Sequence, residues 1–202
     1  MPLWIAIVVL NYLLAHDLLA NDADAHDAAI RIELAKLADS SSEVRATAIE
    51  SLTSTKDGRV GEVLEAFRLG SLCLWKQRLV VGSPVRGKDD VFSLKDALSG
   101  QPLVEGGQPV RVPKSDLVTL AASRKERRRV VIAIRFLALY SANQPTRLRA
   151  VKKLGDLQNV AVIDQLKEII ASDTDAQVIF RARESVALLQ LGNPAAELSL
   201  RR

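Results

Sequence analysis

The sequence predicts a mainly α-helical fold, a solenoid of stacked helix pairs interrupted by a small β-rich insert. Three observations support this prediction. Aromatic residues make up only 4% of the 202 residues while hydrophobic residues make up 48%, a balance that favours helices packed through Ala, Leu and Val. Apolar stripes of helical period recur towards both ends of the chain. Between them, residues 71–113 carry turn residues at the spacing of short strands.

The first element is an apolar run at residues 3–15. It is shorter than the roughly 20 residues that a transmembrane helix requires, and its length suits the hydrophobic region of a secretory signal. Ala23-Asp24-Ala25 offers a small-x-small cleavage site, although no Lys or Arg precedes the run. The alternative is a first helix that caps the core. We therefore expect residues 1–25 to be a signal peptide or an N-terminal apolar helix.

Residues 26–70 are predicted to form the first HEAT-like repeats. Val44, Ala48 and Leu52 are spaced four residues apart, so they lie on one face of a helix. Asp57-Gly58 supplies the turn to the next helix. Such a helix pair cannot bury its apolar face alone, and stacking on neighbouring pairs completes the core.

The same scheme returns 102 residues later. At this offset Ala150 falls on Ala48 and Leu154 on Leu52, and a third copy opens at Ala176. Repetition at a fixed offset is the sequence signature of repeat architectures. A generic bundle would show similar stripes without matching turns.

Residues 71–113 change character. Apolar stretches at residues 73–76 and 78–81 have the length of strands, and Gly82-Ser83-Pro84 ends the second. The pattern predicts a small meander or a pair of hairpins. An insert of this kind often carries a recognition surface, and the alternative is a structural flap that covers the stack.

From Lys114 the pattern becomes helical, with Ser115 as a possible cap and a dense apolar helix at residues 130–140. Residues 114–202 are thus predicted to be linking helices and C-terminal HEAT-like repeats. The last repeat is incomplete, because the helix predicted at residues 195–202 stops after about two turns. This ending suggests a fragment, or a partner that continues the stack.

The net charge of +4 comes from one cluster, residues 124–129, which read Arg-Lys-Glu-Arg-Arg-Arg. Three interpretations stay open: a solvated helix face, a contact with anionic lipid head groups or an acidic partner, and nucleic-acid binding. The last is the least supported, because no aromatic residues are interleaved with the cluster. The predicted docking surface consists of its five cations: Arg124, Lys125, Arg127, Arg128 and Arg129.

Catalytic chemistry has little support in the sequence. The two histidines, His16 and His26, lie next to the predicted signal, so the folded part lacks a base for a Ser-His-Asp or Cys-His mechanism. Cys73, flanked by leucines, is best explained as a small buried hydrophobe. No phosphate-binding Gly-x-x-x-x-Gly-Lys-Ser/Thr loop is present. We expect neither enzyme activity, nor a cofactor, nor a metal site.

The strand pair at residues 72–81, the segments at residues 92–103 and 112–117 and the Arg-rich helix after them carry a family resemblance. In this order the chain resembles the N-terminal extracytoplasmic region of the urea ABC transporter permease subunit, a branched-chain amino-acid-type permease. Asp96-Ala97-Leu98-Ser99-Gly100 and residues 112–117 are the most specific matches, and the resemblance covers roughly residues 25–200.

Two features depart from that family. Ala121-Ala122-Ser123 stands where the family tends to carry an Asn-Asn pair, which weakens any inherited role for that loop. The membrane-spanning permease segments are also absent from this sequence, so the chain by itself provides no transport path.

The resemblance implies a non-catalytic accessory domain of a urea-type ABC importer. Its expected location is periplasmic or extracytoplasmic and membrane-associated, and its expected partners are the transporter permease or the substrate-binding protein. Anionic lipid head groups are a further possible contact, and nucleic acid is not expected. The alternative is a HEAT-repeat adaptor or scaffold protein in the cytoplasm, unrelated to transport.

Overall fold

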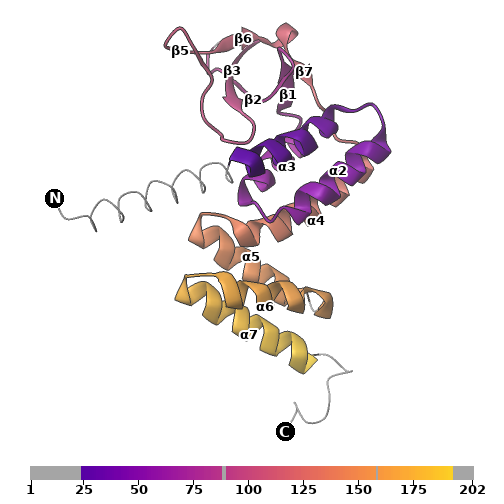
Figure 1. The fold of residues 1–202 in the computed structure, drawn as a ribbon, viewed down its shortest axis with the longest axis vertical. Helices are drawn as coiled ribbons and strands as arrows, with labels where there is room; N and C mark the ends of the chain where they lie inside the picture. The colour runs from indigo at the N-terminus through magenta and orange to yellow at the C-terminus, as the bar shows by residue number, and fades with distance from the viewer. Residues whose placement is uncertain (1–23, 88–89, 158, 193–202) are drawn as a thin grey trace, which may run out of the picture.

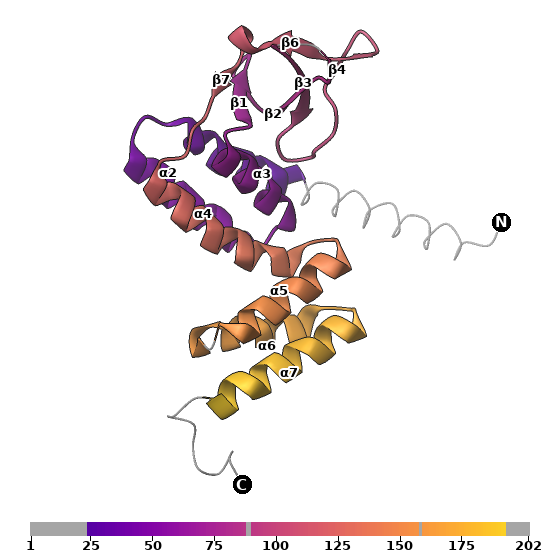
Figure 2. The ribbon, with the colours of Figure 1, turned by 180° about the vertical axis from the view of Figure 1, so that it is seen from behind.

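The computed structural model describes residues 24–87, 90–157 and 159–192. The predicted signal or N-terminal helix therefore lies almost wholly outside the described residues, as do His16 and the helix predicted at residues 195–202. Figures 1 and 2 show helices stacked along the long axis of the molecule, with a sheet at one end.

The helical elements begin with a helix described over residues 24–35. Its continuation and the other helices are η1 (Lys36–Ala38), α2 (Ser42–Ser54), α3 (Gly58–Leu69), α4 (Arg124–Leu137), η3 (Ala138–Tyr140), α5 (Gln144–Asp156), η4 (Val160–Val162), α6 (Ile163–Ser172) and α7 (Ala176–Gly192). Side chains of the preferred capping types begin several of them: Ser41 caps α2, Asp57 caps α3 and Asn143 caps α5.

Seven strands and one short helix separate α3 from α4. They are β1 (Leu72–Trp75), β2 (Arg78–Pro84), β3 (Val91–Asp96), β4 (Val104–Glu105), β5 (Gln108–Pro109), β6 (Arg111–Pro113), η2 (Lys114–Asp116) and β7 (Val118–Thr119). Five strands form an antiparallel sheet in the order β6-β3-β2-β1-β7, and β4 and β5 form a separate pair.

The sheet must curl, because its two edge strands are neighbours in the chain. Five strands laid flat would place β6 and β7 about 19 Å apart. The chain from Pro113 to Val118 spans at most about 18 Å, and η2 shortens it further. Strand β1 lies between two apolar cores and is therefore apolar on both faces. Leu72 packs in the helical core, whereas Cys73 and Trp75 face the interior of the curled sheet.

The prediction of a mainly α-helical solenoid is wrong. The fold is mixed α/β, because the segment expected to be a small insert forms a curled five-stranded sheet. The sheet has an apolar core of its own, distinct from the helical core. That core consists of Cys73, Trp75, Val80, Leu94, Val110 and Val112.

The sheet also extends beyond the expected boundary at residue 113. The segment after Lys114 was predicted to be helical, but η2 leads into β7, which pairs with β1. Strand pairing overrides the local helical pattern here, and α4 begins only at Arg124, after its cap Ser123.

The offset of 102 residues relates whole elements as well as single residues. It carries the bounds of η1 onto those of η3 and the bounds of α2 onto those of α5. Two of the predicted stripe residues are buried in both copies, Ala48 and Leu52 in one core and Ala150 and Leu154 in another, whereas Val44 in the first turn of α2 is exposed. The sheet is thus inserted between two copies of one helical unit.

Candidate functional site

The five predicted docking residues all belong to the first two turns of α4, which runs between α2 and α5 (Figure 2). The structure shows that they differ in role. Arg127 donates from Nε to the carbonyl of Ala122 at 3.0 Å, and Arg129 pairs with Glu50 at 3.2 Å. The other three cations are exposed and form no hydrogen bond or ion pair with any described residue: Arg124, Lys125 and Arg128.

These three unpaired cations lie where a helix least favours positive charge. The N-terminus of a helix carries a partial positive charge, so an acidic side chain is preferred there. Glu126 is the single acid of this turn, but it is buried and engaged elsewhere. It completes a capping box with Ser123 and accepts a hydrogen bond from Arg45 Nε at 2.7 Å.

The buried position of Glu126 affects its charge state. Burial by itself would raise the pKa of this carboxyl, but the hydrogen bonds from Arg45 and Ser123 lower the pKa below its usual value. Glu126 therefore stays ionised and neutralises Arg45, so its charge is not available to the exposed cations.

An open groove of about 420 Å³ lies further along α4, from Arg129 onwards. Helical geometry places Lys125, Ile132 and Phe136 on the same side of α4, at positions i, i+7 and i+11. Ile132 is 55% exposed although it is a large apolar residue. The groove is lined by Ile49, Glu50, Thr53, Ser54, Lys56, Arg129, Ile132, Ala133, Phe136, Tyr140 and Gln165.

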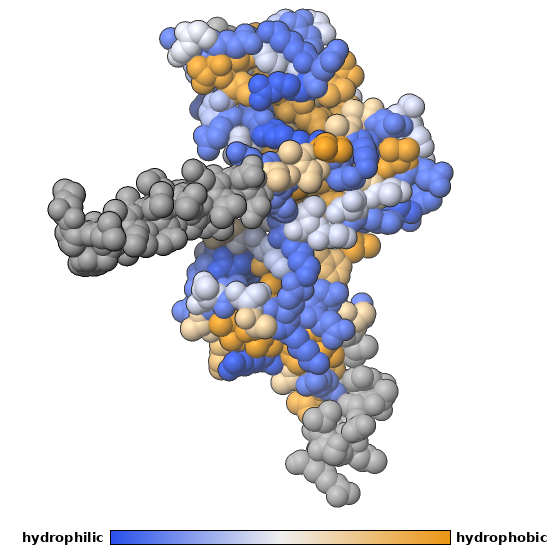
Figure 3. All heavy atoms as spheres, viewed as in Figure 1, coloured by the Kyte–Doolittle hydropathy of each residue, from blue (hydrophilic) through white to orange (hydrophobic). Residues whose placement is uncertain are grey.

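Ion pairs lie at two places along the edge of this groove. Arg129 and Glu50 link α4 to α2, and Lys56 joins Glu168 of α6 at 2.5 Å. The Lys56 ammonium also lies 6.0 Å from the ring centre of Tyr140. We call the groove together with Arg124, Lys125 and Arg128 the α4 surface. Apolar side chains reach the exterior elsewhere too, in separate patches (Figure 3).

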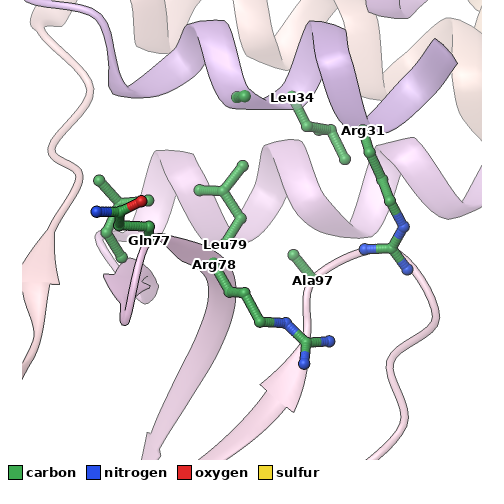
Figure 4. Close-up of a pocket in the computed structure, with 8 residues that line it drawn as sticks. Arg31, Leu34, Gln77, Arg78, Leu79 and Ala97 are labelled. Atoms are coloured by element: carbon green, nitrogen blue, oxygen red, sulfur yellow. The ribbon is translucent and has the colours of Figure 1, made fainter. Parts of the chain in front are cut away.

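A second cavity, of about 370 Å³, lies between the helix of residues 24–35 and the β1–β2 hairpin (Figure 4). Asp96, at the end of β3, fixes the relation of these elements. Its carboxylate accepts two hydrogen bonds from Arg31, at 2.9 and 3.0 Å, and one from Arg78 at 3.3 Å. The cavity is lined by Arg31, Leu34, Ala35, Leu74, Gln77, Arg78, Leu79 and Ala97.

Asp96 is only 5% exposed, and burial alone would raise its pKa. The hydrogen bonds from Arg31, and from the backbone and hydroxyl of Ser99, hold the pKa far below its usual range instead. The carboxylate is therefore ionised at neutral pH, and it connects a helix to the sheet.

Cys73 and His26, the described residues considered for catalysis, make no hydrogen bond or ion pair with each other. Cys73 faces the interior of the curled sheet, where burial raises the pKa of its thiol, so the reactive thiolate is disfavoured. His26, on the first helix, lies 3.7 Å from Asp57, which caps α3 and pairs with Arg59. Within residues 24–87, 90–157 and 159–192, no three His, Cys, Asp or Glu residues are grouped to hold a metal ion.

Asp96 and Arg31 were not predicted as site residues from the sequence. Asp96 belonged to a segment noted only for its family resemblance, and Arg31 is one of many surface-type cations. One signal was available in the sequence: a strand pattern ends at Asp96, and Ser99 follows three residues later. This spacing allows the carboxylate to accept hydrogen bonds from the turn after the strand.

Comparison with protein-family models, with curated proteins and with solved structures finds no match to this chain. The resemblance to the urea permease family therefore stays a prediction. Among the described residues, no helix combines the length and the apolar character needed to cross a bilayer.

Proposed function

We propose that the protein is a non-catalytic binding module that engages a partner protein through the α4 surface. The observation that carries this proposal is the outer surface of α4, which presents three cations without a described partner in its first two turns and lines an open apolar groove from Arg129 onwards, with Lys125 on the groove's side of the helix. Apolar area supplies affinity, and complementary charge supplies orientation and a fast encounter. A partner that presents apolar side chains flanked by acidic groups would satisfy both parts of this surface.

The family resemblance supplies a setting for this activity. In that setting the chain is an extracytoplasmic accessory domain of a urea-type ABC importer, and the partner is the substrate-binding protein or a neighbouring transporter surface. The concave shape of the groove favours a protein partner over a lipid surface, because a side chain can fill it and a planar layer of head groups cannot.

The test is the affinity of the purified protein for the cognate urea-binding protein, measured by surface plasmon resonance with and without urea. The triple charge reversal Arg124→Glu, Lys125→Glu and Arg128→Glu should weaken binding by about tenfold or more. It should not lower the melting temperature, because these cations pair with no residue that the structure describes and acids suit a helix start.

A matched control reverses three exposed cations of α5, Arg149, Lys152 and Lys153, and so changes net charge equally. It should leave binding within about twofold of the unmodified protein. Ile132→Ser tests the groove and should weaken binding by about tenfold. Absence of association, or equal losses in both charge reversals, would reject the proposal.

A further inference from the structure

The cavity between the first helix and the β1–β2 hairpin has polar groups at both ends and an apolar middle. Figure 4 shows the guanidinium groups of Arg31 and Arg78 on the side of Ala97, and the amide of Gln77 at the far side. Leucine side chains lie between these ends. A volume of about 370 Å³ falls within the range of small-molecule sites, which combine apolar walls with a few placed polar groups.

The two guanidinium groups are held in place yet retain free donors. Each guanidinium has five N–H groups. Asp96 takes two from Arg31 and one from Arg78, and it takes them from a nearly buried position. Its single negative charge faces two positive charges, so the cavity mouth keeps a net positive charge. A fixed carboxylate behind two arginines is the kind of support that preorganises a binding site.

The hairpin turn that carries Gln77 is conformationally costly. Lys76 and Gln77 have φ of +47° and +63°, and a two-residue turn of this shape favours Asn-Gly. A residue with a Cβ atom is strained in this left-handed region, because its Cβ approaches the backbone carbonyl too closely. The Lys76 side chain gains a stacking contact with Trp75, 4.3 Å from the ring centre, and an ion pair with Glu105. Gln77 gains no hydrogen bond within the described chain, and it lines the cavity.

We infer that this cavity binds a small organic carboxylate that has an apolar body and a hydrogen-bonding group at its other end. The carboxylate accepts from the free N–H groups of Arg31 and Arg78, the apolar body contacts the partly buried Leu74 and Leu79, and the distal group bonds to the amide of Gln77. This assignment is independent of the α4 surface and of the partner proposed for it.

The test uses N-acetyl-leucine, which carries these three parts, and N-acetyl-leucinamide, its uncharged counterpart of the same size. Both are titrated into the ¹⁵N-labelled protein and followed by backbone amide shifts. N-acetyl-leucine should shift amides around Gln77, Leu79 and Ala97. The amide should bind about tenfold more weakly, the loss expected when a charge-assisted hydrogen bond is removed.

Arg78→Gln should weaken binding of N-acetyl-leucine by about tenfold, since one guanidinium is lost. The fold should survive, because Arg78 is 59% exposed on its side chain and makes one bond to Asp96. Arg86→Gln, an exposed arginine beyond the end of β2, is the matched control and should bind normally.

A second variant, Gln77→Gly, removes the distal amide and relieves the turn, so it should raise the melting temperature while weakening binding several-fold. The inference is overturned if N-acetyl-leucine and its amide bind equally, if their shifts fall outside the cavity, or if Arg78→Gln binds as the unmodified protein does.

Discussion

Two arginines related by the offset of 102 residues form the same clamp in different surroundings. Arg45 donates from Nε to Glu126 and from a terminal nitrogen to the carbonyls of Asp39 and Ser40. Arg147 donates from Nε to Asp173 and from a terminal nitrogen to the carbonyls of Ser141 and Ala142. The accepting carbonyls, those of Asp39 and Ser40 and those of Ser141 and Ala142, are related by the same offset.

Each clamp ties one helical unit to the start of the next. Arg147 and Asp173 are 26 residues apart, whereas Arg45 and Glu126 are 81 residues apart because the whole sheet lies between them. The clamp is thus independent of the length of the intervening chain. The helical stack can hold the inserted sheet because the two ends of the insert lie beside one another on the stack. The entropy cost of closing such a connection rises only slowly with its length.

The units differ in how closely their backbones approach. A Cβ on Gly58 would lie 2.6 Å from the carbonyl oxygen of Tyr140, so the first unit needs glycine where it meets η3. The corresponding position of the second unit, 102 residues on, is Val160. The junction between units therefore depends on one missing side chain as well as on a clamp.

The largest expected effect comes from breaking the longer clamp. Glu126→Ala leaves Arg45, whose side chain is only 19% exposed, without its partner and removes the capping box of α4. Loss of one member of a buried ion pair costs about 3 kcal/mol or more of unfolding free energy. Urea unfolding followed by circular dichroism measures it.

Asp173→Ala breaks the corresponding clamp of Arg147. It should lower the free energy of unfolding by about as much as Glu126→Ala does, because the two clamps have the same form. Glu43→Ala removes an exposed acid from α2 and should change stability by about 0.5 kcal/mol or less. Equal effects of Glu126→Ala and Glu43→Ala would show that the clamp does not join the units.

Gly58→Ala tests the junction between the units and has the next largest expected effect. The new methyl group would meet the backbone of Tyr140 and Ser141, which cannot rotate away, so about 2 kcal/mol of stability should be lost. In a Trp4→Phe background, Trp75 fluorescence reports on the sheet and circular dichroism reports on the helices.

The two probes should give separate transitions in Gly58→Ala if the junction couples the units. Gly61→Ala, on the same helix and with only an ordinary contact to Leu137 Cβ at 3.5 Å, is the matched control and should unfold as one transition. Coincident and unshifted transitions in both variants would contradict the role of Gly58.

Much of the helical part could be predicted from the sequence because it depends on local periodicity. The stripe of Ala48 and Leu52 and its copy at Ala150 and Leu154 are buried, since apolar residues four apart share a helix face. The third copy predicted to open at Ala176 coincides with the start of α7, which packs on α5 and α6 as α4 packs on α2 and α3.

The sheet could be predicted only in part, because its shape depends on contacts distant in sequence. Local patterns indicate β1 and β2, whereas β7 has two residues and exists only through its pairing with β1. The basic cluster of α4 was visible, but which cations lack partners depends on Glu50 and Ala122, which lie on other segments. Asp96 and Arg31 meet for the same reason.

Acid should loosen the sheet from the first helix, and this is the smallest of the expected effects. The pKa of Asp96 is depressed in the fold, so its contribution to stability is fully present above the ordinary value near 3.8 and is lost as the pH falls through the lower folded value. Because Arg31 and Arg78 are about half exposed, solvent screens the pairs and the contribution at neutral pH is about 1 kcal/mol.

Asp96→Asn should therefore be less stable than the unmodified protein at pH near 7 by about this amount in urea unfolding followed by Trp75 fluorescence. The difference should shrink as the pH is lowered below the ordinary value, since the carboxyl of the unfolded chain is then protonated while that of the folded protein is still ionised, so folding must release the proton. A difference that stays constant across the acid range would mean that the carboxylate charge does not hold the sheet to the first helix.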